Sequence, residues 1–150
     1  MSYQTWHDYG YGICVDDIET TVDKVLELVA IAPKFKKNFY DWVKDYMEDE
    51  DIEELTMDDI DSYEDSPYCD SGLAPIIASV IQECENVELF CCSDYNCYHY
   101  LIFSTTYPWC LNDKVKNMTE KDMCHLFTKY INILTDIPIV IDYQSVENGG

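Results

Sequence analysis

The sequence contains no arginine, and all nine of its basic residues are lysines. Arginine is the side chain that most often binds phosphate and guanine through paired hydrogen bonds, so a nucleic-acid-binding protein without it is unusual. The net charge of −21 also repels DNA, RNA and anionic lipid. We therefore expect no direct binding of nucleic acid and no binding to a membrane surface.

The chain also lacks the features of membrane-spanning and secreted proteins. No stretch approaches the ~18 apolar residues of a membrane span, and the N-terminal MSYQTWHDYGYG has neither the basic nor the apolar segment of a signal peptide. The eight cysteines include no C-x2-C pair. These observations predict a cytoplasmic protein with reduced, largely buried cysteines, including Cys84 and Cys124 on helices and Cys91 or Cys92 in a strand.

The pattern closest to a zinc site is incomplete. The cysteine and histidine side chains around a predicted hairpin turn are Cys91, Cys92, Cys97 and His99. Structural zinc needs four ligands, usually as two close pairs. Cys110 and His125 are candidates for the missing second pair only if the fold brings them near. We expect ordinary strand and turn cysteines here.

Other sequence patterns that resemble functional motifs are also incomplete. The run from Asp59 opens like an EF-hand calcium loop, but Glu64 stands where glycine is needed and Asp70 where glutamate is usual. Gly10 and Gly12 are not followed by the third glycine of a dinucleotide-binding fingerprint, so they indicate close packing or a bulge. No G-x-S-x-G or comparable signature surrounds a nucleophile. We expect no metal, no cofactor and no enzymatic activity.

What the chain has in abundance is acidic residues in one place. Residues 45–70 contain 13 acidic side chains and no lysine, arginine or histidine. A few apolar residues interrupt them, and Thr56 followed by Met57-Asp58-Asp59 resembles a helix N-cap with acids in the first turn. We expect short helical turns here, held by the apolar residues, with the acids facing water.

The whole chain, residues 1–150, predicts a single α+β domain into which this acidic segment is inserted. Apolar residues at helical spacing predict helices over 16–32, 33–46, 73–84 and 119–134. Thr119 and Asp122 predict a capping box for the last of them. β-Branched and aromatic runs predict strands at 9–15, 87–92, 98–105 and 138–143, followed by a tail. This order favours a three- or four-stranded, mainly antiparallel sheet with about four helices on one side.

The acidic segment carries the functional prediction. Duplex DNA has one charge per ~1.7 Å of axis, and a helix rises ~1.5 Å per residue, so acids at half the positions approach a similar density. Such an array would bind a basic nucleic-acid-binding protein or nuclease complex and exclude its nucleic acid. The expected partner-binding residues are Glu48, Asp49, Glu50, Asp51, Glu53, Glu54, Asp58, Asp59, Asp61, Glu64 and Asp65.

Two other interpretations remain open. A charge run is most often a solvated segment that keeps a protein soluble. The 13 tyrosines suggest an adaptor or interaction domain that binds a protein through a tyrosine-rich apolar surface, with the acids serving solubility only. These interpretations differ in the expected effect of salt, which weakens charge-driven binding most.

In size, acidity, absence of arginine and lack of catalytic motifs, the chain resembles the small proteins of phages and mobile elements that block host defence, notably the acidic anti-CRISPR proteins. The resemblance concerns the character of the whole chain and involves no shared motif. It implies a stoichiometric inhibitor that occupies the nucleic-acid-binding surface of a nuclease complex. Those proteins share no common fold, so no residue role is transferred.

Overall fold

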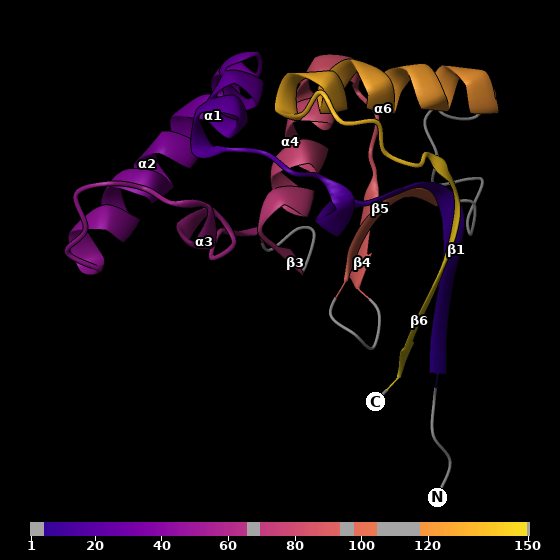
Figure 1. Ribbon diagram of the computed structural model, residues 1–150, viewed down its shortest axis with the longest axis horizontal. Helices are drawn as coiled ribbons and strands as arrows, with labels where there is room; N and C mark the ends of the chain where they lie inside the picture. The colour runs from indigo at the N-terminus through magenta and orange to yellow at the C-terminus, as the bar shows by residue number, and fades with distance from the viewer. Residues whose placement is uncertain (1–4, 66–69, 94–97, 105–117, 150) are drawn as a thin grey trace, which may run out of the picture.

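A four-stranded antiparallel sheet, in the order β4-β5-β1-β6, organises the fold. The computed structural model describes residues 5–65, 70–93, 98–104 and 118–149 (Figure 1). Its sheet strands are β1 (Thr5–Cys14), β4 (Phe90–Ser93), β5 (His99–Ser104) and β6 (Asp142–Gly149). A two-stranded ribbon is formed by β2 (Glu64–Asp65) and β3 (Asp70–Ser71). The predicted antiparallel sheet is confirmed.

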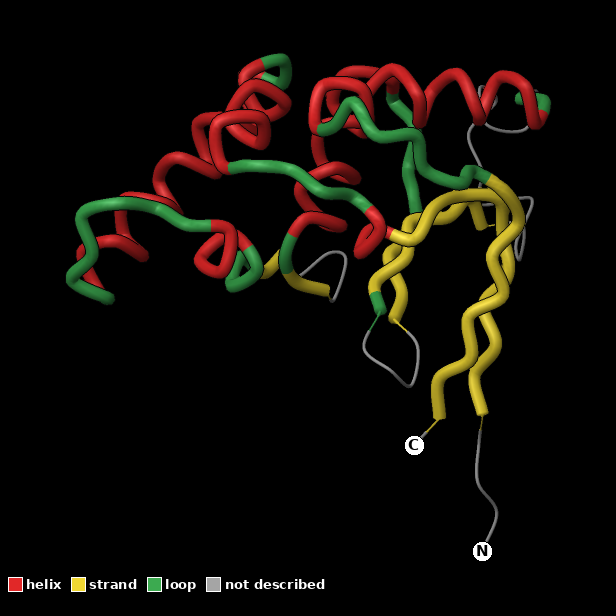
Figure 2. Tube along the Cα trace, viewed as in Figure 1, coloured by secondary structure: helices red, strands yellow, loops and turns green. Residues whose placement is uncertain are grey.

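The centre of the sheet depends on two glycines. Gly10 and Gly12 of β1 pair with Ser104 and Ile102 of β5, and a Cβ atom at either glycine would overlap a backbone carbonyl of β5. Only glycine therefore permits this approach of the two strands, which confirms the close packing expected from the sequence. Beyond β5, the pairing of β1 with β6 continues alone to Thr5 and Gly149, as the long ribbon in Figure 2 shows.

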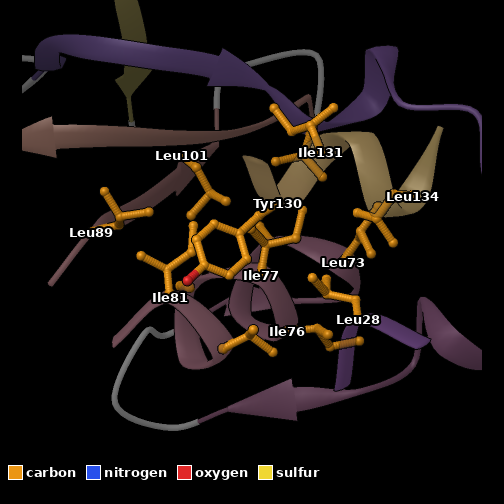
Figure 3. Close-up of a cluster of buried hydrophobic side chains, with 14 of the residues drawn as sticks. Leu28, Leu73, Ile76, Ile77, Ile81, Leu89, Leu101, Tyr130, Ile131 and Leu134 are labelled. Carbon is orange, nitrogen blue, oxygen red and sulfur yellow. The ribbon is translucent and has the colours of Figure 1, made fainter. Parts of the chain in front are cut away.

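Two helices cover the core face of the sheet. The helices of the described chain are α1 (Val22–Ala30), α2 (Pro33–Asp49), α3 (Met57–Ile60), α4 (Leu73–Glu85) and α6 (Glu120–Leu134), with a 3-10 turn η1 (Val15–Asp17). Of these, α4 contacts β4 and β5, and α6 contacts β1. In Figure 3, Tyr130 of α6 lies among Ile77 and Ile81 of α4 and Leu101 of β5. Each such buried apolar side chain contributes about 1.5–3 kcal/mol to folding.

The other helices form a second tier. Helix α1 packs on α2, α4 and α6, and α2 packs on α4. Figure 1 places α2 and α3 on the far side of α4 from the β1–β6 ribbon, which ends at the chain termini. The result is the predicted α+β domain, with the acidic segment at one end and the termini at the other.

Several predicted boundaries were wrong. Strand β1 begins at Thr5 instead of residue 9, and β4 spans Phe90–Ser93 instead of 87–92. The helix expected to begin at Asp16-Asp17 begins at Val22, because the Asp16 carboxylate accepts the backbone N–H of His99 and Thr21 caps the helix instead. The last strand is 142–149, not 138–143: the polar segment expected to be a tail pairs with β1. Backbone pairing with an available strand edge formed this strand without the apolar alternation on which the prediction relied.

Cysteine burial was also predicted only in part. Cys91 is buried in β4, and Cys124 is half-buried. Cys84 is exposed, with its thiol directed at the Ile31 carbonyl oxygen, 3.4 Å away. Cys97 and Cys110, both named for a zinc site, lie outside the described residues.

Candidate functional site

The described part of the acidic segment, residues 45–64, is called the acidic arm below. It begins on the last turn of α2, where the helix ends in a Schellman motif: the N–H of Ile52 donates to Met47 O at 3.1 Å, and that of Asp51 to Glu48 O at 3.3 Å. The motif needs a left-handed residue, and Asp51 supplies it with φ of 51°. Aspartate tolerates this conformation better than most residues. The turn that carries the densest acids is therefore hydrogen-bonded.

The carboxylates of the arm point into solvent. Ten of its eleven acidic side chains are exposed, and Asp59 is the half-buried one. Within the described residues, no lysine forms an ion pair with any of them, and Asp59 alone accepts hydrogen bonds through its carboxylate. Asp65 lies in β2, and its side chain is outside what the structure describes. The arm thus presents a concentrated and uncompensated negative charge.

A row of aromatic rings fixes the arm to the rest of the fold. Along the inner face of α2, Trp42 stacks on Tyr46 with ring centroids 5.0 Å apart, and Tyr63 meets Trp42 edge-on at 5.1 Å and Phe39 at 5.4 Å. Phe39 and Tyr63 are buried. Aromatic pairs of this geometry add about 0.5–1.5 kcal/mol each beyond the area they bury. Both ends of the arm, on α2 and after α3, are held by one cluster.

The short helix α3 adds a second anchor. Thr56 forms the predicted N-cap, and with Asp59 it completes a capping box, in which Asp59 accepts the Thr56 N–H at 2.8 Å and the Thr56 side chain accepts the Asp59 N–H at 3.4 Å. The other oxygen of Asp59 accepts the Tyr46 hydroxyl at 3.0 Å. The hydrogen bonds from Thr56 lower the pKa of Asp59. Asp59, predicted to bind a partner, thus has a structural role within the arm.

The charges of α2 oppose its dipole at both ends. The last turn and C-cap carry Glu48, Asp49 and Glu50 and no basic residue, where a helix dipole favours cations. Lys34 and Lys36 lie in the first turn, where it favours anions. Each misplaced surface charge costs about 0.3–1 kcal/mol at low ionic strength. Helix stability therefore does not explain why acids occupy the end of α2.

Acids elsewhere have structural partners. Glu83 of α4 caps α2 from outside: its two carboxylate oxygens accept the backbone N–H groups of Phe35 at 2.8 Å and Lys34 at 3.1 Å. Glu85 accepts the Tyr130 hydroxyl at 2.7 Å and the Lys129 ammonium at 3.1 Å. Burial and this carboxylate raise the pKa of Tyr130. Sequence inspection missed both roles, because each joins residues more than 40 positions apart.

A polar cleft of about 510 Å³ lies where η1, α3 and the start of α4 meet. Asp16, Glu19, Asp61, Thr20 and His99 supply its polar side chains. Burial, then the nearby charges of Asp58 and Asp16, raises the pKa of Asp61. No three cysteine, histidine or acidic side chains of the described chain converge as metal ligands, here or elsewhere. The cleft brings one acid of the predicted binding set, Asp61, together with Asp16 and Glu19 near the sheet.

The exposed tyrosines are spread out. Tyr40 lies on α2, Tyr98 precedes β5 and Tyr143 lies on β6, whereas Tyr11, Tyr63 and Tyr130 are buried. Within the residues that the structure describes, no two exposed tyrosines share an element. The surface tyrosines of the described residues thus come from different elements, and the tyrosine-rich surface considered as an alternative stays a prediction.

Comparisons with known proteins assign no family: no family model, no curated protein and no solved structure matches the chain. Among the helices described here, none combines the length and apolar character needed to cross a bilayer.

Proposed function

We propose that this protein is a non-enzymatic inhibitor whose acidic arm occupies the basic nucleic-acid-binding surface of a partner, such as a host defence nuclease complex. The observation that carries the proposal is the anchored turn at the end of α2. Seven acids, Asp45, Glu48, Asp49, Glu50, Asp51, Glu53 and Glu54, fall within ten residues there, all exposed and without ion pairs among the described residues.

Charge density supports the comparison with nucleic acid. Duplex DNA carries one charge per ~1.7 Å of axis, and the arm places seven acids within ten residues, three on the end of α2 and four in the turn and loop that follow it. Because the turn is hydrogen-bonded and the aromatic cluster holds its base, little ordering entropy is lost when a partner binds. The field of a −21 protein also accelerates encounter with a basic surface, and this effect weakens with salt.

Apolar side chains within the arm provide short-range contacts. Met47, Ile52 and Leu55 are half-buried between the acids, so each offers part of its surface to a partner. Charge alone gives fast but weakly specific binding, and apolar contacts at the centre of an interface supply most of its affinity. The arm combines both within one segment.

The test is a pull-down from a nuclease-treated lysate of the source organism, at 0.1 M and 0.5 M salt, read by mass spectrometry. The chain termini lie away from the arm (Figure 1), so a terminal tag leaves it accessible. The test variant replaces Glu48, Asp49, Glu50, Asp51, Glu53 and Glu54 with Gln or Asn. We expect a nucleic-acid-binding protein to be captured at low salt and lost at high salt and by the variant.

A charge-matched pair separates position from net charge. Glu50→Gln, Asp51→Asn and Glu53→Gln change the arm, whereas Asp17→Asn, Glu88→Gln and Asp136→Asn remove three exposed acids elsewhere. We expect the first set to weaken binding at least tenfold and the second by less than threefold. Equal losses would reduce the arm to a contribution to net charge, and a partner retained by the six-residue variant would refute the proposal.

A further inference from the structure

An open apolar groove runs along the outer face of α1 and α2 and reaches the acidic arm. It has a volume of about 560 Å³ and is lined by Val22 and Leu26 of α1, Tyr40, Val43, Lys44, Met47 and Glu48 of α2, and Leu55 of the arm. The opposite faces of these helices pack inward, where Val25, Val29 and Phe39 are completely buried. The apolar groove residues Val22, Leu26, Val43, Met47 and Leu55 are only half-buried.

The groove has the dimensions of a helix-binding site. Val22 and Leu26 are spaced i, i+4, and Tyr40, Val43 and Met47 are spaced i, i+3, i+7, so two helical ridges flank a channel about 10 Å long. Two or three turns of a third helix fill such a channel by ridge-into-groove packing. Side chains at i, i+3, i+4 and i+7 of that helix would enter it.

The charges around the groove select a basic occupant. Asp23 and Glu27 directly follow the groove residues Val22 and Leu26 on α1 and are exposed. Glu48 borders the groove from α2, where the densest acids begin. The cations there are Lys44 in the lining and Lys36, whose ammonium lies 5.4 Å from the centroid of the Tyr40 ring. A second copy of this chain would bring another −21 protein against the same acids, and an anionic lipid surface would be repelled likewise.

We infer that the groove binds a basic amphipathic helix of the partner, with its apolar face between α1 and α2 and its lysines or arginines against Asp23, Glu27 and the arm. This inference rests on the proposed function and names the element of the partner that the protein captures. It assigns to the α1–α2 face an apolar contact that charge mimicry alone does not require.

The test uses two synthetic 18-residue peptides of leucine and lysine with identical composition. One places its leucines on a single helical face, and the other distributes them around the helix. Binding is measured by calorimetry at 0.1 M salt, and perturbed amides are mapped by NMR on the full-length protein.

The groove variant is Leu26→Gln with Met47→Gln. The control is Phe90→Gln, which also replaces an apolar side chain with glutamine; Phe90 is 43% exposed and lies on β4, away from the groove. Circular dichroism confirms that each variant is folded.

We expect the amphipathic peptide to bind at least tenfold more tightly than the other, with amide shifts along the groove. The groove variant should lose at least tenfold in affinity, and Phe90→Gln less than twofold. Equal affinity of the two peptides, abolished by neutralising the arm, would overturn the groove assignment and leave the proposed function standing. Absence of binding to both peptides would count against both proposals. Should the groove variant unfold, amide shifts confined to other surfaces would still overturn the inference.

Discussion

The two ends of this protein use carboxylates in opposite ways. In the body formed by the sheet, α4 and α6, acids act as hydrogen-bond acceptors: Glu83 caps α2, and Glu85 binds Tyr130 and Lys129. In the acidic arm, Asp59 alone does so among the described residues, while the others face water, and Glu48, Asp49 and Glu50 lie at the end of α2 where the helix dipole disfavours acids. The difference indicates that the body's acids stabilise the fold, whereas the arm's acids are maintained at some cost to it.

The largest effect on stability is expected in the body. Phe127 is completely buried in α6 and meets Phe103 of β5 edge-on, with centroids 5.4 Å apart. Phe127→Ala removes this contact and leaves a cavity, so we expect a loss of about 3–5 kcal/mol in the free energy of unfolding. Urea denaturation measures it. A loss below 1 kcal/mol would show that α6 is not part of the core.

A pair of glutamates tests the comparison directly. Glu85→Ala leaves the Tyr130 hydroxyl without its carboxylate acceptor and should cost about 1–3 kcal/mol. Glu54→Ala changes an exposed acid of the arm and should stay within about 0.5 kcal/mol of the wild type. Thermal and urea unfolding of both variants give the two values. Similar losses would remove the distinction between the two kinds of acid.

Loss of the cap that Glu83 provides to α2 should lower the free energy of unfolding by an intermediate amount. Glu83→Ala leaves the N–H groups of Lys34 and Phe35 without their acceptor, and loss of a helix N-cap costs about 0.5–2 kcal/mol. Hydrogen exchange should increase most in the first turn of α2. A larger increase in the arm than in the first turn of α2 would contradict the assignment of Glu83 as the cap of that turn.

Neutralising acids at the end of α2 should stabilise the protein. Glu48→Gln with Asp49→Asn relieves an unfavourable interaction with the helix dipole worth about 0.3–1 kcal/mol per charge. The gain should shrink at 0.5 M salt, because exposed charges are screened. The control, Glu88→Gln, lies outside a helix and should change stability little. A destabilised double variant would mean that these acids have structural partners.

The smallest expected effect is a pH dependence of the free energy of unfolding, which has opposite signs for Asp61 and Asp59. Because the pKa of Asp61 is raised in the folded state, its ionised form lowers the stability of the fold at neutral pH. This loss of stability disappears as the pH falls through the raised pKa towards the usual 3.8. The lowered pKa of Asp59 gives stability that is present above 3.8 and is lost as pH falls through the folded pKa.

Urea unfolding between pH 7 and pH 3 compares Asp61→Asn and Asp59→Asn with the wild type. Asp61→Asn should be more stable than the wild type at pH 7 and lose this advantage in acid. Asp59→Asn should be less stable at pH 7, with a difference that narrows in acid. Any reversal of these signs would contradict the environments described for the two carboxyls.

The sequence predicted the parts of the fold that depend on neighbouring residues. Apolar spacing identified α2, α4 and α6, and the N-cap at Thr56 and the capping box at Thr119 formed as expected. Strand β6 was predicted too early in the sequence, because its polar residues are held by backbone pairing with β1, a contact between the two ends of the chain. The Glu83 cap was missed because it joins α4 to α2.

For the candidate site, composition located the acids but not their arrangement. The Schellman motif at Asp51 lacks the usual glycine, so the sequence offered no signal for an ordered turn there. The structural role of Asp59 had one local sign, the capping box, and one remote partner, Tyr46. The groove forms only when α1 and α2 lie side by side, which residue patterns do not specify.

Competition with nucleic acid tests the central claim most directly. A fluorescent duplex or single strand is bound to the captured partner, and this protein is added while anisotropy and complex size are followed. The account predicts stoichiometric release of the nucleic acid, which the variant with six neutralised acids does not cause. A stable ternary complex, in which the partner holds both ligands at once, would contradict it.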